Sequence, residues 1–505
     1  MKKTPFPMAY EVAQARKYLD KLVIGPLDKN NGELWMCCPH LYNEALEKTY
    51  GEHAGYNRIY PPAMSRRDKR DAHKLDETMI KGDTVTKEGT EKDIIQIWHK
   101  IYTKKGWHKY ATYDKKGGFN RPYILFKAKN VTDANIREEK LMKVRPIAPG
   151  TKHPMRRLLH LAGRAWSFIA TNLEGDHFVI EHCGKVVDFL KEDLPTLEGE
   201  GPLRKKIWDI VSCYPNMPRD VIRHALRDMV QKITRKQGHV GVAVPKYKDT
   251  KACTWMVAPQ QRTTRRGRHT FHLREETPGT AYLYFEVLLD IMEFALDHAI
   301  IKMPNSTLLR QAQGIPMGDP LSPGMTIAAC AWMEHEWMQS IHGTDKRCFK
   351  AKRYMDDIIM FWKEKPEWDS TRFIADFERS TCYFPPLELE AGRQDTFLET
   401  TIELDERGEL RHWLKNDNAD GSDRIWRYQH FGSHAPYKQK RAVLTACLRK
   451  VHQHASDEKA LILSAIQKMR EFERLFYPRH MLKAACTFMA ASLRSPVWFD
   501  IRDHY

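Results

Sequence analysis

Two adjacent aspartates in front of an apolar run constrain the fold of this chain most. Asp356 and Asp357 stand directly before the run from Ile358 to Trp362, and the apolar stretch ahead of them is short. This pattern predicts a β-hairpin with the acidic pair at its tip. Two carboxylates at such a tip repel each other unless a cation neutralises them. Because no His or Cys lies nearby, these oxygen ligands favour a hard ion such as Mg²⁺.

A third aspartate lies inside a second apolar stretch. Asp209 follows Trp208 and precedes Ile210, in a segment predicted to be a buried strand that ends in a turn at Pro215-Asn216. A buried charge of this kind needs a partner. If this strand pairs with the strand of the acidic pair, the three carboxylates converge. Such convergence is what two-metal phosphoryl transfer requires.

Length and charge bound the class of protein. A chain of 505 residues is longer than one core usually holds, so several packed subdomains are expected. The formal net charge of +17 points to a polyanionic partner such as nucleic acid, although a generically basic surface gives the same number. The sequence has no CxxC pair, and Cys37, Cys38 and His40 lack the second half of a zinc site. Reduced cysteines of an intracellular protein are the simpler interpretation.

Targeting signals are not evident in the sequence. The N-terminus lacks the apolar run of a secretory signal, and no stretch of about 18 apolar residues exists that would cross a membrane. We therefore expect an intracellular protein that is neither secreted nor membrane-bound.

Local patterns outline the order of elements. Residues 121–150 predict a hairpin whose strands flank a charged loop from Thr132 to Lys140, and residues 154–172 predict a helix. The stretch 231–275 is basic and irregular, and residues 280–302 predict one helix that ends at Pro304. Its acidic residues fall on one face: Glu286, Asp290, Glu293 and Asp297. Further helices are predicted from about Pro436 and after Ser456-Asp457-Glu458.

Three segments resemble reverse transcriptases, in the order of that family's motifs. The sequence DIVSCYPNMP from Asp209 resembles motif A, QGIPMGDPLSP from Gln313 resembles motif B, and RYMDD from Arg353 resembles motif C. The branch that looks most similar is that of the Penelope-like retroelements, which are related to telomerase reverse transcriptase. Segments that resemble the branch's further signatures are ILFKAKN (124–130), KVRPI (143–147), DTFLE (395–399), the S-H-A-P stretch (433–436) and residues 472–480.

The resemblance covers roughly residues 121–485 and implies a fold of the mixed α/β (α+β) class. It implies a right-hand polymerase with fingers, a ferredoxin-like antiparallel palm and a helical thumb. The expected regions are an N-terminal extension of unreadable function (1–120), fingers (121–205), a palm (206–410) with a basic insertion (231–275), and a helical thumb (411–505). The expected activity is RNA-directed DNA synthesis on an RNA and DNA primer-template with deoxynucleoside triphosphates. A nuclear location is expected if the chain is a eukaryotic retroelement.

The resemblance also implies roles for single residues. Asp209 and Asp356 are expected to bind two Mg²⁺ ions (or Mn²⁺), with Asp357 in a less direct contact and the backbone carbonyl of Ile210 as a further candidate ligand. Tyr214, five residues after Asp209, matches the position that excludes a 2′-hydroxyl; a core tyrosine is the alternative. Residues that match positions beside the incoming nucleotide are Lys129, Arg145, Gln313 and Gly314.

Basic residues interleave with aromatic ones in the predicted thumb. They suggest a surface that follows a nucleic-acid backbone, and a basic helix face over core aromatics is the alternative. The residues expected to bind nucleic acid are Arg424, Arg427, Lys438, Lys440 and Arg441.

Two positions depart from the branch. Asp319 follows Met317-Gly318 where the branch usually has Ser, and Met355 stands where it more often has Val. Two other functions remain open. A viral RNA-dependent RNA polymerase usually has Gly-Asp-Asp in motif C and a second Asp near Tyr214, and neither is present here. A non-catalytic RNA-binding scaffold tends to lose the metal carboxylates, which this chain retains.

Overall fold

A four-stranded antiparallel sheet forms the palm. The structure is a computed structural model that describes residues 9–28, 30–59, 91–127, 144–247, 252–257, 261–264, 267–270, 277–365, 368–416, 428–433 and 435–505. Across the sheet the order is β14-β15-β6-β16, and every neighbouring pair is antiparallel. The strands are β14 (Phe349–Tyr354), β15 (Asp357–Trp362), β6 (Arg204–Ile210) and β16 (Leu389–Ala391).

The apolar run after the two aspartates is buried on both faces of this sheet. Ile358 and Met360 belong to the main core of the molecule, whereas Ile359 and Phe361 belong to a second core on the opposite face. A strand with one solvated face would alternate between apolar and polar residues. The consecutive apolar residues of β15 therefore reflect its position in the middle of a covered sheet.

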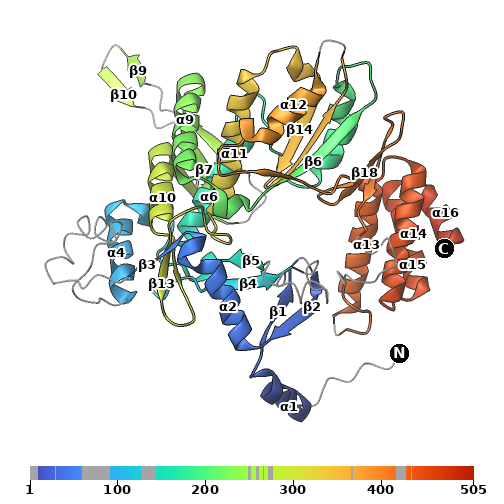
Figure 1. Cartoon of the computed structure of the whole chain (residues 1–505), viewed down its shortest axis with the longest axis horizontal. Coiled ribbons are helices and arrows are strands. Elements are labelled where there is room, and N and C mark those ends of the chain that lie inside the picture. The colour runs from blue at the N-terminus through green and yellow to red at the C-terminus, as the bar shows by residue number, and fades with distance from the viewer. Residues whose placement is uncertain are drawn as a thin grey trace.

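Helices cover the main-core face of the palm (Figure 1). The tightest helix pair there is α6 with α11, where the backbone at Gly324 approaches Gly163 so closely that a Cβ would lie 2.3 Å from the Gly163 carbonyl oxygen. The predicted helix at 154–172 is confirmed as α6. The helices are α6 (Arg156–Thr171), α9 (Arg219–Gln237), α10 (Phe285–Asp297), α11 (Ser322–Ser340) and the shorter α12 (Ser370–Asp376).

The prediction of one helix over residues 280–302 is wrong at both ends. Residues Thr280–Tyr284 form strand β11, which pairs with β7, and Ile300–Lys302 form strand β12. The helix is restricted to α10 and ends at Asp297, before Pro304. Strand pairing on each side overrides helical periodicity at the ends of the segment. The acidic face is real, but it forms ion pairs with α9 and with Lys105.

The fingers contain the predicted hairpin at 121–150. Strands β4 (Tyr123–Phe126) and β5 (Val144–Ile147) pair antiparallel, which confirms its two strands, while the predicted loop lies outside the described residues. Two described elements of the N-terminal region pack against later parts of the chain: Trp98 of α4 (Glu91–Lys104) stacks on His153, and β3 (Tyr56–Ile59) pairs with β13 (Leu308–Gln311). The remaining elements there are α1 (Ala9–Leu19), β1 (Val23–Leu27), β2 (Asn30–Cys37) and α2 (Pro39–Tyr50).

The stretch 231–275 is more regular than its composition predicts. Its first residues complete α9, and its middle supplies two strands of a three-stranded sheet with the order β11-β7-β8. The prediction of an irregular insertion is therefore wrong for residues 231–245, 254–257, 261–264 and 267–270. Its strands are β7 (His239–Pro245), β8 (Thr254–Val257), β9 (Gln261–Thr264) and β10 (Gly267–Thr270).

A small sheet connects the palm to a helical thumb. The sheet has the order β17-β18-β19, and the thumb helices that follow share a core of their own (Figure 1). The strands and thumb helices are β17 (Thr396–Phe397), β18 (Thr400–Leu404), β19 (Leu410–Leu414), α13 (Tyr437–His454), α14 (Glu458–Arg474), α15 (Arg479–Leu493) and α16 (Val497–His504). Both predicted C-terminal helical regions are confirmed.

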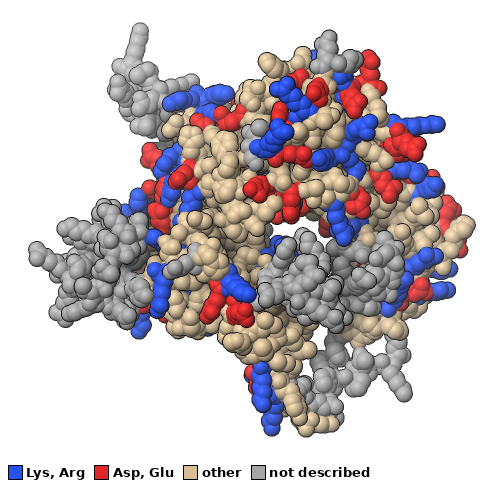
Figure 2. All heavy atoms as spheres, in the orientation of Figure 1, with Lys and Arg blue, Asp and Glu red and all other residues tan. Residues whose placement is uncertain are grey.

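Fingers, palm and thumb surround a central opening in the space-filling view (Figure 2). Basic and acidic side chains mix over this face, so the net charge does not gather into one patch here. In the part of the chain that the structure describes, no helix is long and apolar enough to span a membrane.

Candidate active site

The acidic pair lies in the turn of the β14–β15 hairpin, as predicted. Tyr354 pairs with Asp357 as the last register pair of the hairpin, and Met355 and Asp356 form the turn between them. Met355 has a φ of 58°, in the left-handed region that a residue with a side chain rarely adopts. The turn therefore holds its aspartates in a backbone conformation that the surrounding structure has to maintain.

Strand pairing brings the third aspartate to the same place. In the antiparallel ladder of β15 and β6, Asp357 is the register partner of Asp209. Residues directly opposite each other in a ladder point to the same face, with Cβ atoms roughly 5 Å apart. The backbone N–H of Ile210 also donates to the carbonyl of Asp356, at 2.9 Å. The register of the sheet thus sets Asp357 opposite Asp209, and the backbone bond keeps Asp356 next to them. The meeting of the three carboxylates at one point stays a prediction.

The ligand chemistry of these residues fits a hard cation. Carboxylate oxygens and a backbone carbonyl at Ile210 are the ligands that Mg²⁺ prefers. Among the described residues, no group of three or more His, Cys, Asp or Glu side chains already stands at metal-ligand geometry. Ion binding would therefore require the carboxylates to turn toward one point.

A fourth acidic residue lies beside these aspartates. Glu390 of β16 is the register partner of Asp209 on its other side, so Asp357, Asp209 and Glu390 form one row across three strands, which we call the acidic row. Sequence reasoning missed Glu390 because it lies in a short, mixed segment after the motifs. Alternation of acidic residues at Glu388 and Glu390 before a Gly was the available signal.

The loop that resembles motif B packs against the turn after β6. Gly314 has a φ of 62°, and a Cβ there would lie 2.2 Å from the Pro215 carbonyl oxygen and 2.6 Å from that of Tyr214. The N–H of Ile315 donates to the Tyr214 carbonyl at 2.9 Å. Neighbouring Gln313 is exposed, and its N–H donates to the carbonyl of Gly55 at 3.3 Å. Close backbone approach thus explains the glycine.

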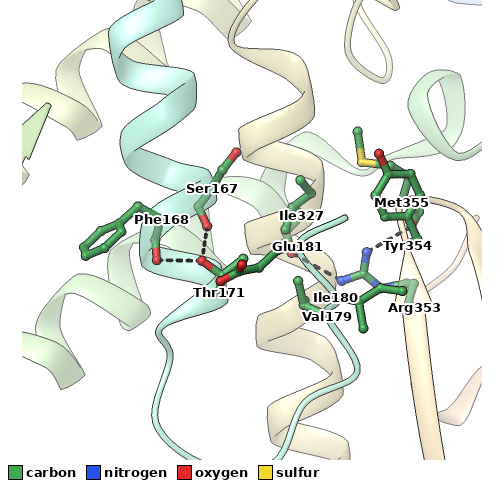
Figure 3. A pocket seen from close by; sticks show the side chains of 10 residues that line it. All are labelled: Ser167, Phe168, Thr171, Val179, Ile180, Glu181, Ile327, Arg353, Tyr354 and Met355. Atoms are coloured by element: carbon green, nitrogen blue, oxygen red, sulfur yellow. Dashed lines mark hydrogen bonds between the residues drawn. The ribbon is translucent and has the colours of Figure 1, made fainter. Parts of the chain in front are cut away.

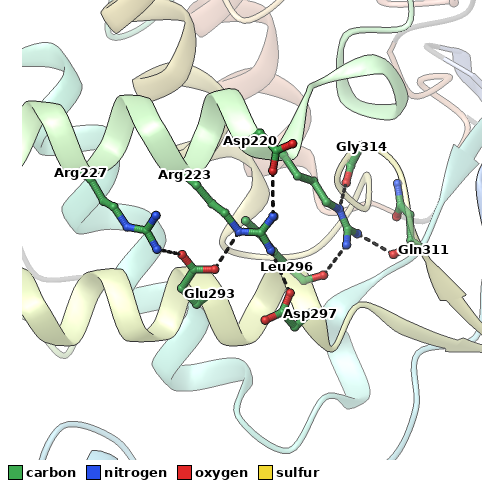
Figure 4. A network of polar contacts seen from close by, with 9 residues as sticks. Asp220, Arg223, Arg227, Glu293, Leu296, Asp297, Gln311 and Gly314 are labelled. Carbon is green, nitrogen blue, oxygen red and sulfur yellow. Dashed lines mark hydrogen bonds and ion pairs between the residues drawn. The ribbon is translucent and has the colours of Figure 1, made fainter. Parts of the chain in front are cut away.

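One arginine forms hydrogen bonds to the loop that resembles motif B. The guanidinium of Arg219 in α9 donates to the carbonyls of Gly314 at 2.9 Å, Gln311 at 2.6 Å and Leu296 at 2.6 Å. Burial is the main cause that lowers the pKa of Arg219, to about 10. Beside it, Arg223 bridges α9 and α10 through their acidic residues (Figure 4). Sequence reasoning missed Arg219, because nothing in the sequence marks it among the many basic residues.

Tyr214 is partly buried in the short helix α8 (Cys213–Asn216). Burial is the main cause that raises the pKa of its phenol, and the neighbouring Cys213 and Asp356 raise it further. The ring packs against the main core, and the negative charge of Asp356 acts on its hydroxyl group. Its role in sugar selection stays a prediction.

The structure describes only one of the two basic residues predicted in the fingers. Lys129 lies outside the described residues. Arg145 of β5 forms an ion pair with Asp28, whose oxygen lies 3.1 Å from the guanidinium, and about one third of the Arg145 side chain remains exposed, at 33%. A triphosphate bound by Arg145 would therefore compete with Asp28.

The proposed thumb surface is supported only in part. Lys438 and Arg441 are exposed on α13, whereas Arg424 and Arg427 lie outside the described residues. Lys440 is buried at 7% exposure, and its ammonium donates to the carbonyls of Phe431 at 2.5 Å and Ser433 at 2.6 Å. A buried, satisfied ammonium orders the loop before α13. This corrects the prediction that Lys440 contacts nucleic acid.

Asp319, which departs from the branch pattern, is a buried residue of the loop that resembles motif B. Its carboxylate accepts from the N–H of Leu321 at 2.9 Å, at the start of α11. Burial is the main cause that raises the pKa of this carboxyl, to about 6, and the hydrogen bonds from Leu321 and Ser322 oppose it. Asp319 therefore serves the start of a helix and is not aimed at the acidic row.

Comparisons with known proteins give a match in fold. No protein-family model and no curated protein matches the chain. The structure of telomerase from Candida albicans with a TWJ fragment of telomeric RNA matches with a TM-score of 0.54 and 12% identity, over 98% of this chain and 70% of that one. The fold is that of a right-hand polymerase. This confirms the predicted fold class.

Weaker matches lie in the same general class. Apo telomerase from Candida tropicalis gives a TM-score of 0.43 at 11% identity, over 95% of this chain and 67% of that one. The Sicinivirus 3Dpol RNA-dependent RNA polymerase gives 0.39 at 11% identity, over 78% of this chain and 71% of that one. These values carry no assignment of activity, which has to be argued from the site.

Proposed function

We propose that this chain is an RNA-directed DNA polymerase that extends a primer by two-metal nucleotidyl transfer. The observation that carries the proposal is the register that sets Asp209 opposite Asp357, with Asp356 next to it in the hairpin turn. Three aspartates at one end of an antiparallel palm would match the requirement of phosphoryl transfer once their carboxylates turn toward one point. Two bound Mg²⁺ ions, or Mn²⁺ in their place, would activate the primer 3′-hydroxyl and neutralise the triphosphate.

The protein's own residues supply binding and selection. Asp209 and Asp356 hold the ions, supported by Asp357. Arg145, released from Asp28, grips the triphosphate together with Lys129, because cations neutralise phosphate charge.

Selection of the sugar belongs to the ring of Tyr214, which excludes a 2′-hydroxyl by its bulk. The rigid backbone at Gly314 supports this selection, since a packed site resists the shift that would relieve an overlap. Deoxynucleoside triphosphates are therefore the proposed substrates.

The natural partner is proposed to be an RNA template with a DNA primer. The motif order and the later segments that resemble the Penelope-like branch favour this choice, and so does the fold shared with a telomerase. Lys438 and Arg441 of α13 are proposed to contact the backbone of the duplex. A retroelement origin, with a nuclear location in a eukaryote, belongs to the same proposal.

Primer extension on matched RNA and DNA templates, with deoxynucleotides and ribonucleotides in separate reactions, tests this function. We expect extension on the RNA template with deoxynucleotides and strong discrimination against ribonucleotides. Preference for ribonucleotides would replace the proposal by an RNA-dependent RNA polymerase. Template binding without extension in Mg²⁺ or Mn²⁺ would favour a non-catalytic scaffold instead.

A further inference from the structure

A fully buried ion pair lies directly behind the catalytic turn. Arg353 of β14 and Glu334 of α11 pair through Nε and Oε1, and both side chains are 0% exposed. A second contact joins Nη2 of Arg353 to Oε2 of Glu334 at 3.4 Å. Burying two charges is costly, so the pair is weak evidence for stability by itself.

The carboxylate of Glu334 is used by neighbours from other parts of the chain. The hydroxyl of Tyr383 donates to its Oε1 at 2.8 Å, and the backbone N–H of Phe178 donates to its Oε2 at 3.0 Å. Phe178 also accepts from the backbone N–H of Arg353, at 2.5 Å. Contacts from Tyr383, Phe178 and Arg353 thus hold Glu334 in place, and Glu334 in turn holds the guanidinium of Arg353.

The rest of the guanidinium faces the turn that carries the aspartates. Nη1 of Arg353 donates to the carbonyl of Met355 at 2.9 Å, and Nη2 reaches the carbonyl of Ile327 at 3.4 Å. Met355 is the residue with a φ of 58°, immediately before Asp356. A residue in this conformation persists only where its surroundings over-determine it.

Packing on this side of the turn is incomplete. A pocket of about 270 Å³ lies between α6, α11 and the end of β14, and its lining includes Thr171, Ile327, Tyr354 and Met355 (Figure 3). The turn therefore has free space to move into. Two hydrogen bonds oppose that movement, one from Arg353 to the carbonyl of Met355 and one from the N–H of Ile210 to the carbonyl of Asp356.

We infer that Arg353, held by Glu334, is a positioning residue that sets the geometry of Asp356 through the Met355 carbonyl. This inference rests on the proposed function and deepens it. It predicts that metal affinity and the rate of chemistry depend on Arg353, although its side chain touches neither ion nor substrate. Groups that orient metal ligands commonly change affinity or activity by about 10- to 100-fold when removed.

A structural role and a positioning role can be separated by a double variant. Removing one partner leaves a buried charge and destabilises the fold, whereas replacing both by apolar residues of similar size often leaves stability unchanged. Arg353→Met with Glu334→Leu should therefore lose the bond to Met355 without leaving a buried charge, although the hydroxyl of Tyr383 and the N–H of Phe178 lose their acceptor. Arg353→Lys is the second variant, because a lysine can pair with Glu334 but lacks the fork that also reaches Met355.

The experiment measures Mn²⁺ binding by electron paramagnetic resonance, and single-nucleotide incorporation over a range of Mg²⁺ concentrations. We expect both palm variants to bind Mn²⁺ about 10-fold or more weakly and to lose kcat by a similar factor, with primer-template affinity unchanged. The matched control removes the buried thumb pair, as Lys468→Met with Glu471→Leu, and should leave both readouts as in the wild type.

Three outcomes are decisive. If Arg353→Lys, or a folded double variant, keeps wild-type Mn²⁺ affinity and kcat, the pair is only structural and the inference is overturned. If the double variant does not fold, Arg353→Lys decides alone by the same criterion. If the wild type extends no primer but the variants still weaken Mn²⁺ binding, the proposed function fails while the positioning inference stands.

Discussion

Replacing Gly314 by alanine should damage both catalysis and stability. The added Cβ would lie 2.2 Å from the Pro215 carbonyl oxygen and 2.6 Å from that of Tyr214. Both are backbone atoms, so no side-chain rotation can relieve the contact. The two segments would have to separate by about 1 Å to reach an ordinary contact distance.

Two costs determine how much stability Gly314→Ala should lose. Alanine in the left-handed region costs about 1–2 kcal/mol, and overpacking adds about 1–3 kcal/mol. Gly238 provides a matched control, because its φ is 68° and a Cβ there would meet nothing within 4 Å. Gly238→Ala should therefore carry the first cost alone.

Denaturant unfolding and single-nucleotide kinetics check this prediction together. We expect Gly314→Ala to lower kcat/KM on the order of 100-fold, because a misplacement of about 1 Å beside the reacting groups is enough for that loss. Gly238→Ala should keep kcat/KM close to that of the wild type. Equal kcat/KM for the two variants would refute the idea that close backbone approach at Gly314 builds the nucleotide site.

Three further predictions concern single side chains. Tyr214→Val should reduce discrimination against ribonucleotides by on the order of 10-fold, which dNTP and rNTP kinetics on one primer-template would reveal; unchanged discrimination would make Tyr214 a core residue. Asp319→Asn should stabilise the protein by up to about 3 kcal/mol at pH 7.5 and by nothing near pH 4. The reason is that the pKa of the Asp319 carboxyl is raised to about 6, so the wild type loses stability as the pH rises from 4 to 6 and this group becomes charged. Urea unfolding at both pH values measures this, and an equal gain at both would contradict the burial argument. Lys440→Met should lower the melting temperature without changing the salt dependence of nucleic-acid binding. By contrast, Lys438→Ala with Arg441→Ala should make that salt dependence less steep. The reverse pattern would show that Lys440 belongs to the binding surface.

The positions of the three aspartates in the strands were predictable because they depend on local sequence. Asp356 and Asp357 precede a run that is apolar on both strand faces, and Asp209 interrupts another such run. Two covered strands with polar interruptions have few ways to pair, so their register follows from matching the polar positions. The hairpin of the fingers was predictable from two apolar runs around a polar stretch, and the thumb helices from the start signals near Pro436 and at Ser456-Asp457-Glu458.

Residues that depend on tertiary contacts were not predictable in this way. Arg219, Arg353 and Lys440 look alike in the sequence, but Arg353 and Lys440 are buried and Arg219 is half-buried, each with its donors on backbone carbonyls or a carboxylate. Thr280–Tyr284 reads as the first turns of a helix until β7 supplies a pairing partner. Burial of a long cation, or capture of a segment by a distant strand, leaves no local pattern.

We propose above all that the three aspartates, at the end of the palm sheet where β15 begins and β6 ends, carry out nucleotidyl transfer. The most direct test of this proposal is single-nucleotide incorporation by Asp356→Asn on an RNA template, with Asp405→Asn as the isosteric control on an exposed turn. Loss of a ligand charge should cost several kcal/mol of transition-state stabilisation, so we expect a fall in kcat of at least about 100-fold. Folding and primer-template binding should stay intact, and the control should be fully active. Near wild-type incorporation by Asp356→Asn in Mg²⁺ would contradict the account.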